Sequence, residues 1–274
     1  MLRAIVLASL FAVPVLADND PATPGQAADP HANTPSAAAP AAPDAPAAPV
    51  DPLAEPRNLV EVQANTKANL KKAIDLYEKA LTDTSIDAKK RSLGYADEAR
   101  AWLRLGDLES DSTAKIADYT AGRAAAQKGK AVDARCAECI YWDMANQAVI
   151  GRTNGVMNSL FMLGDLRKGL NEVLALNPGH KRAKETLAKI DHAVPGLVGG
   201  SDDRAEKSLK EILARDPHFT PAMATLAQFY ADKGNKDAAK EWGHKCLAET
   251  QSSVPNDFRK FDKSDCQKAL KDVE

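Results

Sequence analysis

The feature that most constrains the fold is a helical pattern that returns after 34 residues. Between residues 205 and 247 the chain reads AEKSLKEILARDPHFTPAMATLAQFYADKGNKDAAKEWGHKCL. This segment divides into three stretches whose apolar residues recur every three or four positions, as on one face of a helix. Ala205 and Ala239 occupy equivalent places in the first and third stretches. A fixed period of this length is typical of stacked helical hairpins, so we expect an all-α solenoid.

Small and turn-forming residues at set places strengthen this prediction. Asp216-Pro217 ends the first helix, Pro221 suits a first helical turn, and Gly234 can adopt the left-handed cap. The pattern resembles the tetratricopeptide repeat (TPR), in which small residues fall where two helices approach most closely. We therefore expect a TPR-like α-solenoid over residues 58–274. The residues that carry the resemblance are Ala205, Pro217, Ala222, Leu226, Tyr230, Gly234 and Ala239.

The periodicity continues upstream with one interruption. Pro178 and Pro217 are 39 residues apart, five more than the period allows. The segment PGLVGGSDD at 195–203 accounts for the excess as an enlarged turn, and we expect Asp202 or Asp203 to cap the helix that follows. Together the pattern predicts four helical pairs, with extra terminal helices that include a final cap at about 264–273. Further helical patterns cover residues 69–81, 99–107, 115–130, 136–151, 158–178 and 183–188.

The first 57 residues have a different composition. Residues 1–17, MLRAIVLASLFAVPVLA, have a basic start, an apolar run and a final small residue, as in a signal peptide cleaved after Ala17. The apolar run is too short to span a membrane, which takes about 20 residues. Residues 18–57 hold ten of the 16 prolines and predict a disordered Pro/Ala-rich linker, either a tether or a solubilising leader. We expect the mature protein in the periplasm.

Charge and motif content favour a non-enzymatic protein. The formal net charge is −2 without a basic cluster, which argues against nucleic-acid binding. The five histidines show no metal-binding spacing, and no Ser, His and Asp arrangement stands out. The glycine-rich stretch at 195–203 lacks the lysine and the preceding strand of a phosphate-binding loop. The sequence therefore predicts no catalytic residues, no cofactor and no metal.

Four cysteines allow several interpretations. Cys136 and Cys139 form a CxxC motif, but Ile140 follows where haem attachment requires histidine. Cys246 and Cys266 lack the spacing of a second metal-binding pair. Because exported thiols tend to oxidise, we favour Cys136 with Cys139 and Cys246 with Cys266, the second pair joining the final cap to the last repeat. The alternative that Cys136 and Cys139 are small core residues stays open.

One helix carries a group of aromatic and amide residues. Tyr141 and Trp142 are followed by Asn146 and Gln147, and a ligand groove is typically apolar with a few polar groups of this kind. Core packing is the competing interpretation, and it is the stronger one for Trp142. We expect Tyr141 to be the more exposed of the two.

Several of these features together resemble the T component of TRAP transporters, the TatT family. The resemblance covers about residues 130–250. It implies a periplasmic helical-repeat protein that binds the substrate-binding P component, with a small organic or apolar ligand and a homo-oligomer also implied. On this basis the ligand or partner residues are expected to be Tyr141, Trp142, Asn146, Gln147, Pro195, Gly199 and Gly200. The matching features are Tyr141-Trp142 with Ala145, Leu176-Asn177-Pro178, Pro195 with Gly199-Gly200, and the repeat from Ala205 to Leu247.

The chain also departs from that family. Known members can be lipoproteins, whereas no cysteine lies near Ala17 to accept a lipid. The alternative function is a general TPR scaffold for cell-envelope assembly, which would bind peptide segments in its concave groove.

Overall fold

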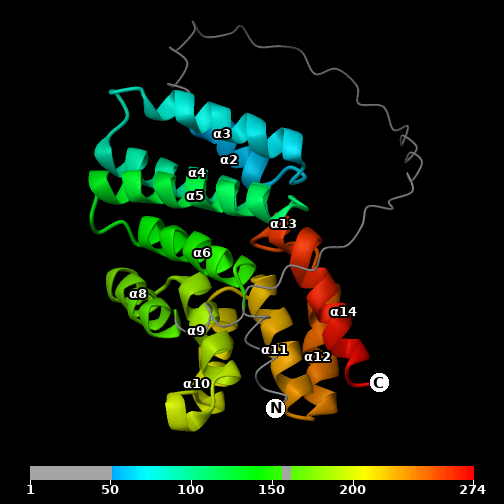
Figure 1. Ribbon diagram of the computed structural model, residues 1–274. Helices are drawn as coiled ribbons and strands as arrows, with labels where there is room; N and C mark the ends of the chain where they lie inside the picture. Colours follow the sequence, from blue (N-terminus) through cyan, green and yellow to red (C-terminus); the bar gives the residue numbers. More distant parts are fainter. Residues whose placement is uncertain (1–50, 156–161) are drawn as a thin grey trace, which may run out of the picture.

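The computed structural model describes residues 51–155 and 162–274, and within these ranges the chain forms helices and turns without a strand (Figure 1). The predicted all-α stack of helical hairpins is confirmed. The predicted signal peptide, linker residues 18–50 and residues 158–161 of one predicted helix lie outside the described residues. The main helices are α2 (Ala54–Glu61), α3 (Lys67–Leu81), α4 (Ala88–Gly106), α5 (Ser112–Val132), α6 (Ala137–Thr153), α8 (Leu163–Leu176), α9 (Lys181–Ala193), α10 (Asp202–Arg215), α11 (Thr220–Asp232), α12 (Lys236–Leu247) and α14 (Lys263–Lys271).

The folded domain begins before the boundary predicted at residue 57. α2 starts at Ala54, and Leu53 is 1% exposed. The prediction that the linker extends to residue 57 is therefore wrong for residues 51–57. The physical reason is that Leu53, with Leu59 and Val60, completes an apolar face that packs in the core with α3 and α4. The prolines near the start of α2 are compatible with a helix because the first turn needs no backbone N–H donors.

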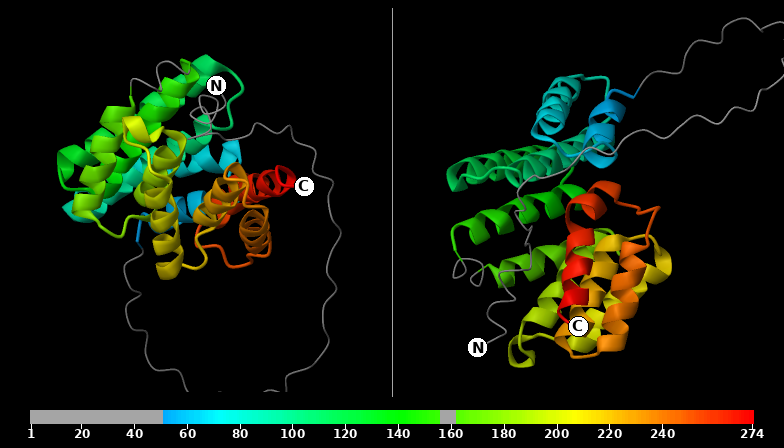
Figure 2. Two further views of the ribbon diagram at one scale, coloured as in Figure 1. Left: turned by 90° about the horizontal axis from the view of Figure 1, so that it is seen from below. Right: turned by 90° about the vertical axis from the view of Figure 1, so that its right-hand side faces the viewer.

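Neighbouring helices pack against one another in chain order, as the layers in Figures 1 and 2 show. The most extensive helix–helix interface is between α4 and α5. Glycine permits a close approach there, because a Cβ atom on Gly106 would lie 2.5 Å from the ring of Tyr119. Tyr119 itself is 1% exposed. At the end of α11, Gly234 adopts a φ of 73°, the left-handed conformation expected there.

The enlarged turn lies between α9 and α10, where it was predicted. It contains the short 3-10 helix η2 (Gly196–Val198). The cap of α10 differs from the prediction: Ser201, and not Asp202 or Asp203, is the N-cap, and its side chain accepts a hydrogen bond from the Arg204 N–H. Asp202 already lies inside the helix, so its carboxylate is free to bond elsewhere.

The last part of the chain folds back onto the inner face of the stack. We call residues 252–262 the strap; it contains α13 (Pro255–Asp257) and the single π-helical turn η3 (Phe258–Asp262). Figure 1 shows α13 between the N-terminal helices and α11. The Asn256 side chain donates a hydrogen bond of 2.7 Å to the backbone carbonyl of Val60 in α2. The strap therefore joins the two ends of the solenoid.

Two disulfide bonds are present, in the pairing that the sequence favoured. Cys136–Cys139 spans the first turn of α6, and Cys246–Cys266 joins α12 to α14. Over residues 51–155 and 162–274, we find no helix with the length and apolar character needed to cross a membrane.

Candidate binding site

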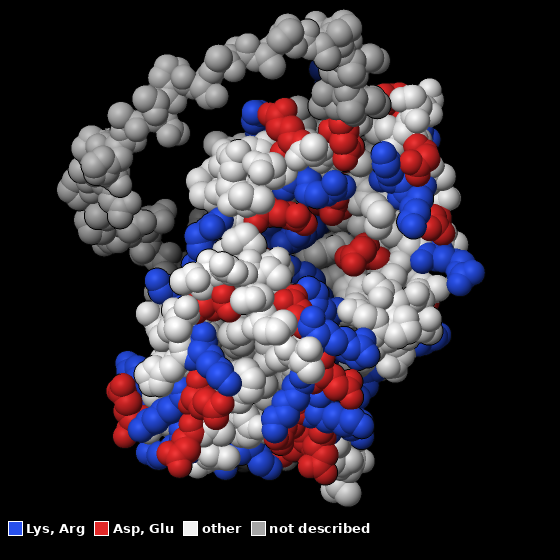
Figure 3. Space-filling view, turned by 180° about the vertical axis from the view of Figure 1, so that it is seen from behind, with Lys and Arg blue, Asp and Glu red and all other residues white. Residues whose placement is uncertain are grey.

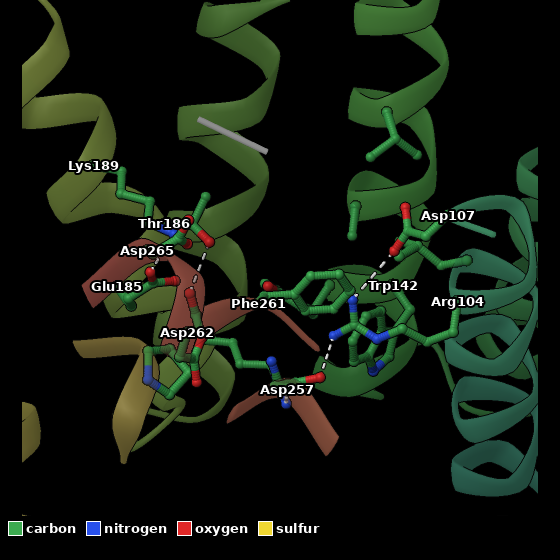
Figure 4. A pocket seen from close by; sticks show the side chains of 16 residues that line it. Arg104, Asp107, Trp142, Glu185, Thr186, Lys189, Asp257, Phe261, Asp262 and Asp265 are labelled. Atoms are coloured by element: carbon green, nitrogen blue, oxygen red, sulfur yellow. Dashed lines mark hydrogen bonds and ion pairs between the residues drawn. The ribbon is translucent and has the colours of Figure 1, made fainter. Parts of the chain in front are cut away.

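An inner cavity of about 130 Å³ lies where α4, α6 and α9 face the strap (Figure 4). Three aromatic residues contribute to its wall: Tyr141, Trp142 and Phe261. The charged side chains divide into two groups. Figure 4 shows Arg104 and Asp107 on one side of Phe261, and Lys189, Glu185 and Asp265 on the other. The cavity thus has an arginine end and an acidic end.

At the arginine end, three guanidinium groups surround the carboxylate of Asp257. Arg104 Nη2 lies 2.5 Å from Asp257 Oδ1 and Arg100 Nη2 lies 3.8 Å from Oδ2, while Arg182 also forms an ion pair with Oδ2. The Asp257 side chain is 3% exposed. Burial alone would raise the pKa of Asp257, but the charges of Arg104, Arg182 and Arg100 outweigh it and hold the pKa well below its usual value. Asp257 is therefore a fixed negative charge.

Other contacts hold the arginines in place. Arg100 bonds Glu61 at 2.9 Å and Arg104 bonds Asp107 at 3.3 Å. The Arg104 guanidinium lies 4.7 Å from the ring centre of Phe261, which favours a cation–π contact. Arg100 and Arg104 also each have a buried Nε atom without a hydrogen-bond partner among the described residues. Each of these two arginines therefore has an N–H group that forms no hydrogen bond with the described residues.

The acidic end has a surplus of carboxylates. Glu185, Asp262 and Asp265 line it together with one cation, Lys189, which pairs with Glu185. Asp262 accepts a 2.6 Å hydrogen bond from the Thr220 hydroxyl. Burial, and then the charge of Asp257, raise the pKa of Asp262 to about 7. At neutral pH this carboxyl is therefore partly protonated.

The structure places only two of the residues predicted to bind a ligand on this cavity, Tyr141 and Trp142. Their ring centres are 5.0 Å apart. Both side chains are buried: Tyr141 is 8% exposed and Trp142 is 5% exposed, so Tyr141 is the more exposed of the two by a small margin only. The reason is that the His180 ring lies 4.8 Å from the tyrosine ring and the strap covers the inner face of the stack.

The two amide residues predicted beside these rings do not line the cavity. Asn146 is fully buried, and its side-chain amide donates hydrogen bonds to the Ala99 and Trp142 carbonyls. It therefore fastens α6 to α4. Gln147 is half-buried and lies outside the cavity wall.

The remaining predicted residues, Pro195, Gly199 and Gly200, lie in the enlarged turn, away from the cavity. Arg204 fixes the conformation of the turn, because its guanidinium donates hydrogen bonds to both carboxylate oxygens of Asp191 and, at 2.6 Å, to the Gly199 carbonyl. Leu197 at its tip is fully exposed. The turn therefore presents an apolar side chain to solvent on a fixed backbone.

Neither the strap nor the arginine end was predicted from the sequence. Arg100 and Arg104 are four residues apart on a predicted helix, so both fall on one face beside apolar neighbours, and that was a usable signal for buried charge. The strap gave no such signal in the sequence, because its contacts join residues up to 197 positions apart.

Figure 3 shows lysine and arginine side chains gathered around a hollow in the face turned away from the viewer of Figure 1.

Fold and pocket together define an all-helical repeat protein with a partly open inner pocket. Residues 203–251 match the family model of the tetratricopeptide repeat, which confirms the repeat predicted from residue 205 onward. The chain is also 33% identical over 86 residues to the interferon-induced protein with tetratricopeptide repeats 3 of Mus musculus. That match covers 31% of this chain and 20% of the mouse protein, so it concerns a minor part of each chain.

Proposed function

We propose that the protein is a non-enzymatic scaffold that binds a partner protein in the cell envelope. The observation that carries this proposal is the tetratricopeptide repeat at 203–251, stacked on the helical hairpins that precede it. Stacked repeats present an extended surface whose side chains can change without loss of the fold, which suits them to binding other proteins.

The enlarged turn is the proposed contact with the partner. Leu197 is fully exposed, and the bonds from Arg204 to Asp191 and to the Gly199 carbonyl hold the turn in one shape. A partner pocket that buries this leucine would gain about 1.5–3 kcal/mol from the hydrophobic effect. Little entropy would be lost, since the turn is already ordered.

Two features support placing the protein outside the cytoplasm, in the periplasm. Residues 1–17 have the pattern of a cleaved signal peptide. All four cysteines are in disulfide bonds, which persist in oxidising compartments and are rare where thiols are kept reduced.

Affinity capture from the native envelope after mild cross-linking tests this proposal. Wild type, Leu197→Ser and the matched control Val62→Ser would be compared, since Val62 is also an exposed apolar residue but lies far from the turn in sequence. We expect wild type and the control to recover the same partner, and Leu197→Ser to recover about tenfold less of it, the equivalent of about 1.4 kcal/mol. Equal recovery with all three proteins would refute the turn as the contact, and no specific partner with any of them would refute the scaffold.

A second candidate is the T component of a TRAP-type uptake system. The observation that favours it is the pocket beside Tyr141 and Trp142, since a protein scaffold requires no such space. In this case the partner is a periplasmic substrate-binding protein and the cavity holds a small organic ligand. The resemblance also implies a homo-oligomer, which light scattering of the purified protein would reveal.

Mass spectrometry of the captured material separates the two candidates. The TRAP candidate requires a substrate-binding protein among the captured partners and a small molecule that co-purifies with wild type. Tyr141→Ala should release that molecule while the helical circular dichroism stays unchanged. A captured assembly protein with no small molecule would reject the TRAP candidate and leave the scaffold in place.

A further inference from the structure

The strap occupies the inner face in the way that a bound peptide would. Its principal bonds reach helices that are far away in sequence: Arg104 and Asp257 are 153 positions apart, and Asn256 and Val60 are 196 apart. These contacts are made by side chains and not by continuation of the helical stack. The strap is thus a short segment laid into a surface formed by other helices.

That surface requires an anion. Arg100 and Arg104 have side chains 10% exposed, and Arg182 is 18% exposed. Burial and the like charges of Arg182 and Arg104 lower the pKa of Arg100, and the carboxylate of Asp257 opposes this effect. Buried charges of one sign are costly without a counter-ion. A carboxylate must therefore lie among these guanidinium groups.

The three arginines depend on the strap to different degrees. Arg100 and Arg104 have second carboxylate partners, in Glu61 and Asp107. Within the part of the chain that the structure describes, the one carboxylate bonded to Arg182 is Asp257. When the strap leaves, Arg182 loses its ion pair and becomes the donor that an incoming carboxylate would meet.

The rest of the C-terminal region is held in place by contacts that do not involve the strap. The Cys246–Cys266 disulfide ties the start of α14 to α12, and α14 also packs against α11. The strap lies between these two cysteines, so it can open only as a closed loop that remains next to its site. η3 within it is a π-helical turn, a form that is rare and is frequently found at functional sites.

From these observations we propose that the inner face around Arg100, Arg104 and Arg182 is a binding site for an acidic segment of a partner protein, which exchanges with the strap. This proposal rests on the scaffold function and adds the chemistry of the partner. The tethered strap competes at an effective concentration in the millimolar range, so the partner segment needs contacts beyond its carboxylate.

The test uses the full chain and a fluorescent peptide with the strap's own sequence, SSVPNDFRKFD, which is residues 252–262. The protein variant Asp257→Asn keeps the three arginines and removes the carboxylate that competes. Its matched control is Asp237→Asn, which changes an exposed carboxyl on α12. Fluorescence anisotropy should show that Asp257→Asn binds the peptide at least about tenfold more tightly than wild type and the control do, a gain of about 1.4 kcal/mol.

A second peptide, with Asn in place of the aspartate at position 257 and with Asp262 kept, tests the role of charge at that position. We expect it to bind the Asp257→Asn protein at least about tenfold more weakly than the unmodified strap peptide does. Equal binding of the two peptides, or equal binding of the unmodified peptide to wild type and variant, would overturn the proposal. So would complete displacement of the peptide by free succinate at equal concentration, because the site would then select a small dicarboxylate.

Two further measurements keep the result interpretable. Hydrogen exchange should be faster in residues 252–262 of the Asp257→Asn protein than in wild type, and unchanged in α12. If the Asp257→Asn protein does not fold, Asn256→Ala replaces it, because this variant removes the bond to Val60 and keeps the three arginines. The scaffold proposal fails separately: capture of the partner depends on Leu197, and peptide exchange on the arginines. Loss of peptide binding with intact capture would therefore reject this inference alone.

Discussion

Gly200 determines the shape of the turn between α9 and α10. A Cβ atom at this position would lie 1.6 Å from the Val194 carbonyl oxygen and 3.0 Å from that of Asp191. Both neighbours are backbone atoms, so neither can rotate away. In the same turn, Gly196 has no atom within 4 Å of the corresponding position. The close approach explains the second glycine of the Gly199-Gly200 pair, which the sequence marked without a physical reason.

Gly200 and Gly196 give a matched pair of substitutions. We expect Gly200→Ala to lower the free energy of unfolding by about 1–3 kcal/mol, as overpacking does. Gly196→Ala should change it by less than about 0.5 kcal/mol, as exposed substitutions usually do. Urea unfolding of the two variants and wild type measures the difference. Equal stability of Gly200→Ala and Gly196→Ala would show that the turn has another conformation.

His192 makes the same region sensitive to pH. Its Nδ1 lies 2.8 Å from Asp202 and its Nε2 lies 3.2 Å from Asp232, so the protonated ring links the start of α10 to the end of α11. Burial alone would lower the pKa of His192, but the bonds to Asp232 and Asp202 outweigh it and raise the pKa above its ordinary value. A raised pKa in the folded state means that the stabilisation is complete below about pH 6.5 and is lost as the pH rises through the folded pKa.

Unfolding at several pH values tests the histidine directly. Between about pH 6 and about pH 8.5, wild type should lose more stability than His192→Gln, since glutamine has no proton to release. Asp262, with its pKa near 7, titrates in the same window in both proteins, so the difference between them isolates His192. Parallel pH profiles for the two proteins would contradict the prediction.

At the scale of single elements, the sequence predicted helices better than it predicted their ends. The 34-residue spacing and the turns at Pro217 and Gly234 were enough to place α10, α11 and α12, because each has a regular apolar face. The cap of α10 at Ser201 was missed, since Ser, Asp and Asp in succession are all good N-caps. The choice depends on tertiary bonds: Asp202 pairs with His192 and Lys233.

The two disulfide bonds should differ in their effect on stability. Cys246–Cys266 connects residues 20 positions apart, and Cys136–Cys139 connects residues three apart. In the loop-entropy view, closing the longer loop contributes about 3 kcal/mol and closing the shorter one contributes less. Cys246→Ser with Cys266→Ser should therefore lower the free energy of unfolding more than Cys136→Ser with Cys139→Ser does. Denaturant unfolding of both double variants provides the comparison, and a larger loss for the CxxC pair would refute this prediction.

At the scale of the whole molecule, the strap turns an open stack into a closed one. Sequence patterns report neighbours within a few turns of helix, which is why the hairpins were predictable and the strap was not. The burial of Tyr141 and the arginine end of the cavity both follow from the strap, so both were missed with it. Even Leu53 and the first turn of α2, which the sequence assigned to the linker, lie in the region that the strap contacts through Asn256 and Val60.

Closure has a measurable consequence for cooperativity. In a linear stack each hairpin contacts only its neighbours, and the two ends can unfold separately. Here Asp257 joins Arg100 and Arg104 of α4 to Arg182 of α9, so one carboxylate couples the N-terminal and C-terminal halves. Removal of one member of a buried ion cluster costs about 3–5 kcal/mol, and Asp257→Ala should lose stability in this range. The loss should also be accompanied by uncoupling of the two halves.

Hydrogen exchange followed by mass spectrometry can resolve this uncoupling. In wild type, α2 and α14 should exchange through one common unfolding event. In Asp257→Ala, α2 should exchange faster than α11 and α12, because α2 loses the strap's bond to Val60 and keeps only its contacts with α3 and α4. Asp237→Asn, at an exposed carboxyl of α12, is the control and should match wild type. If Asp257→Ala instead lowers protection equally in every helix, the strap stabilises the fold without coupling its halves, and the solenoid is a single cooperative unit through helix packing alone.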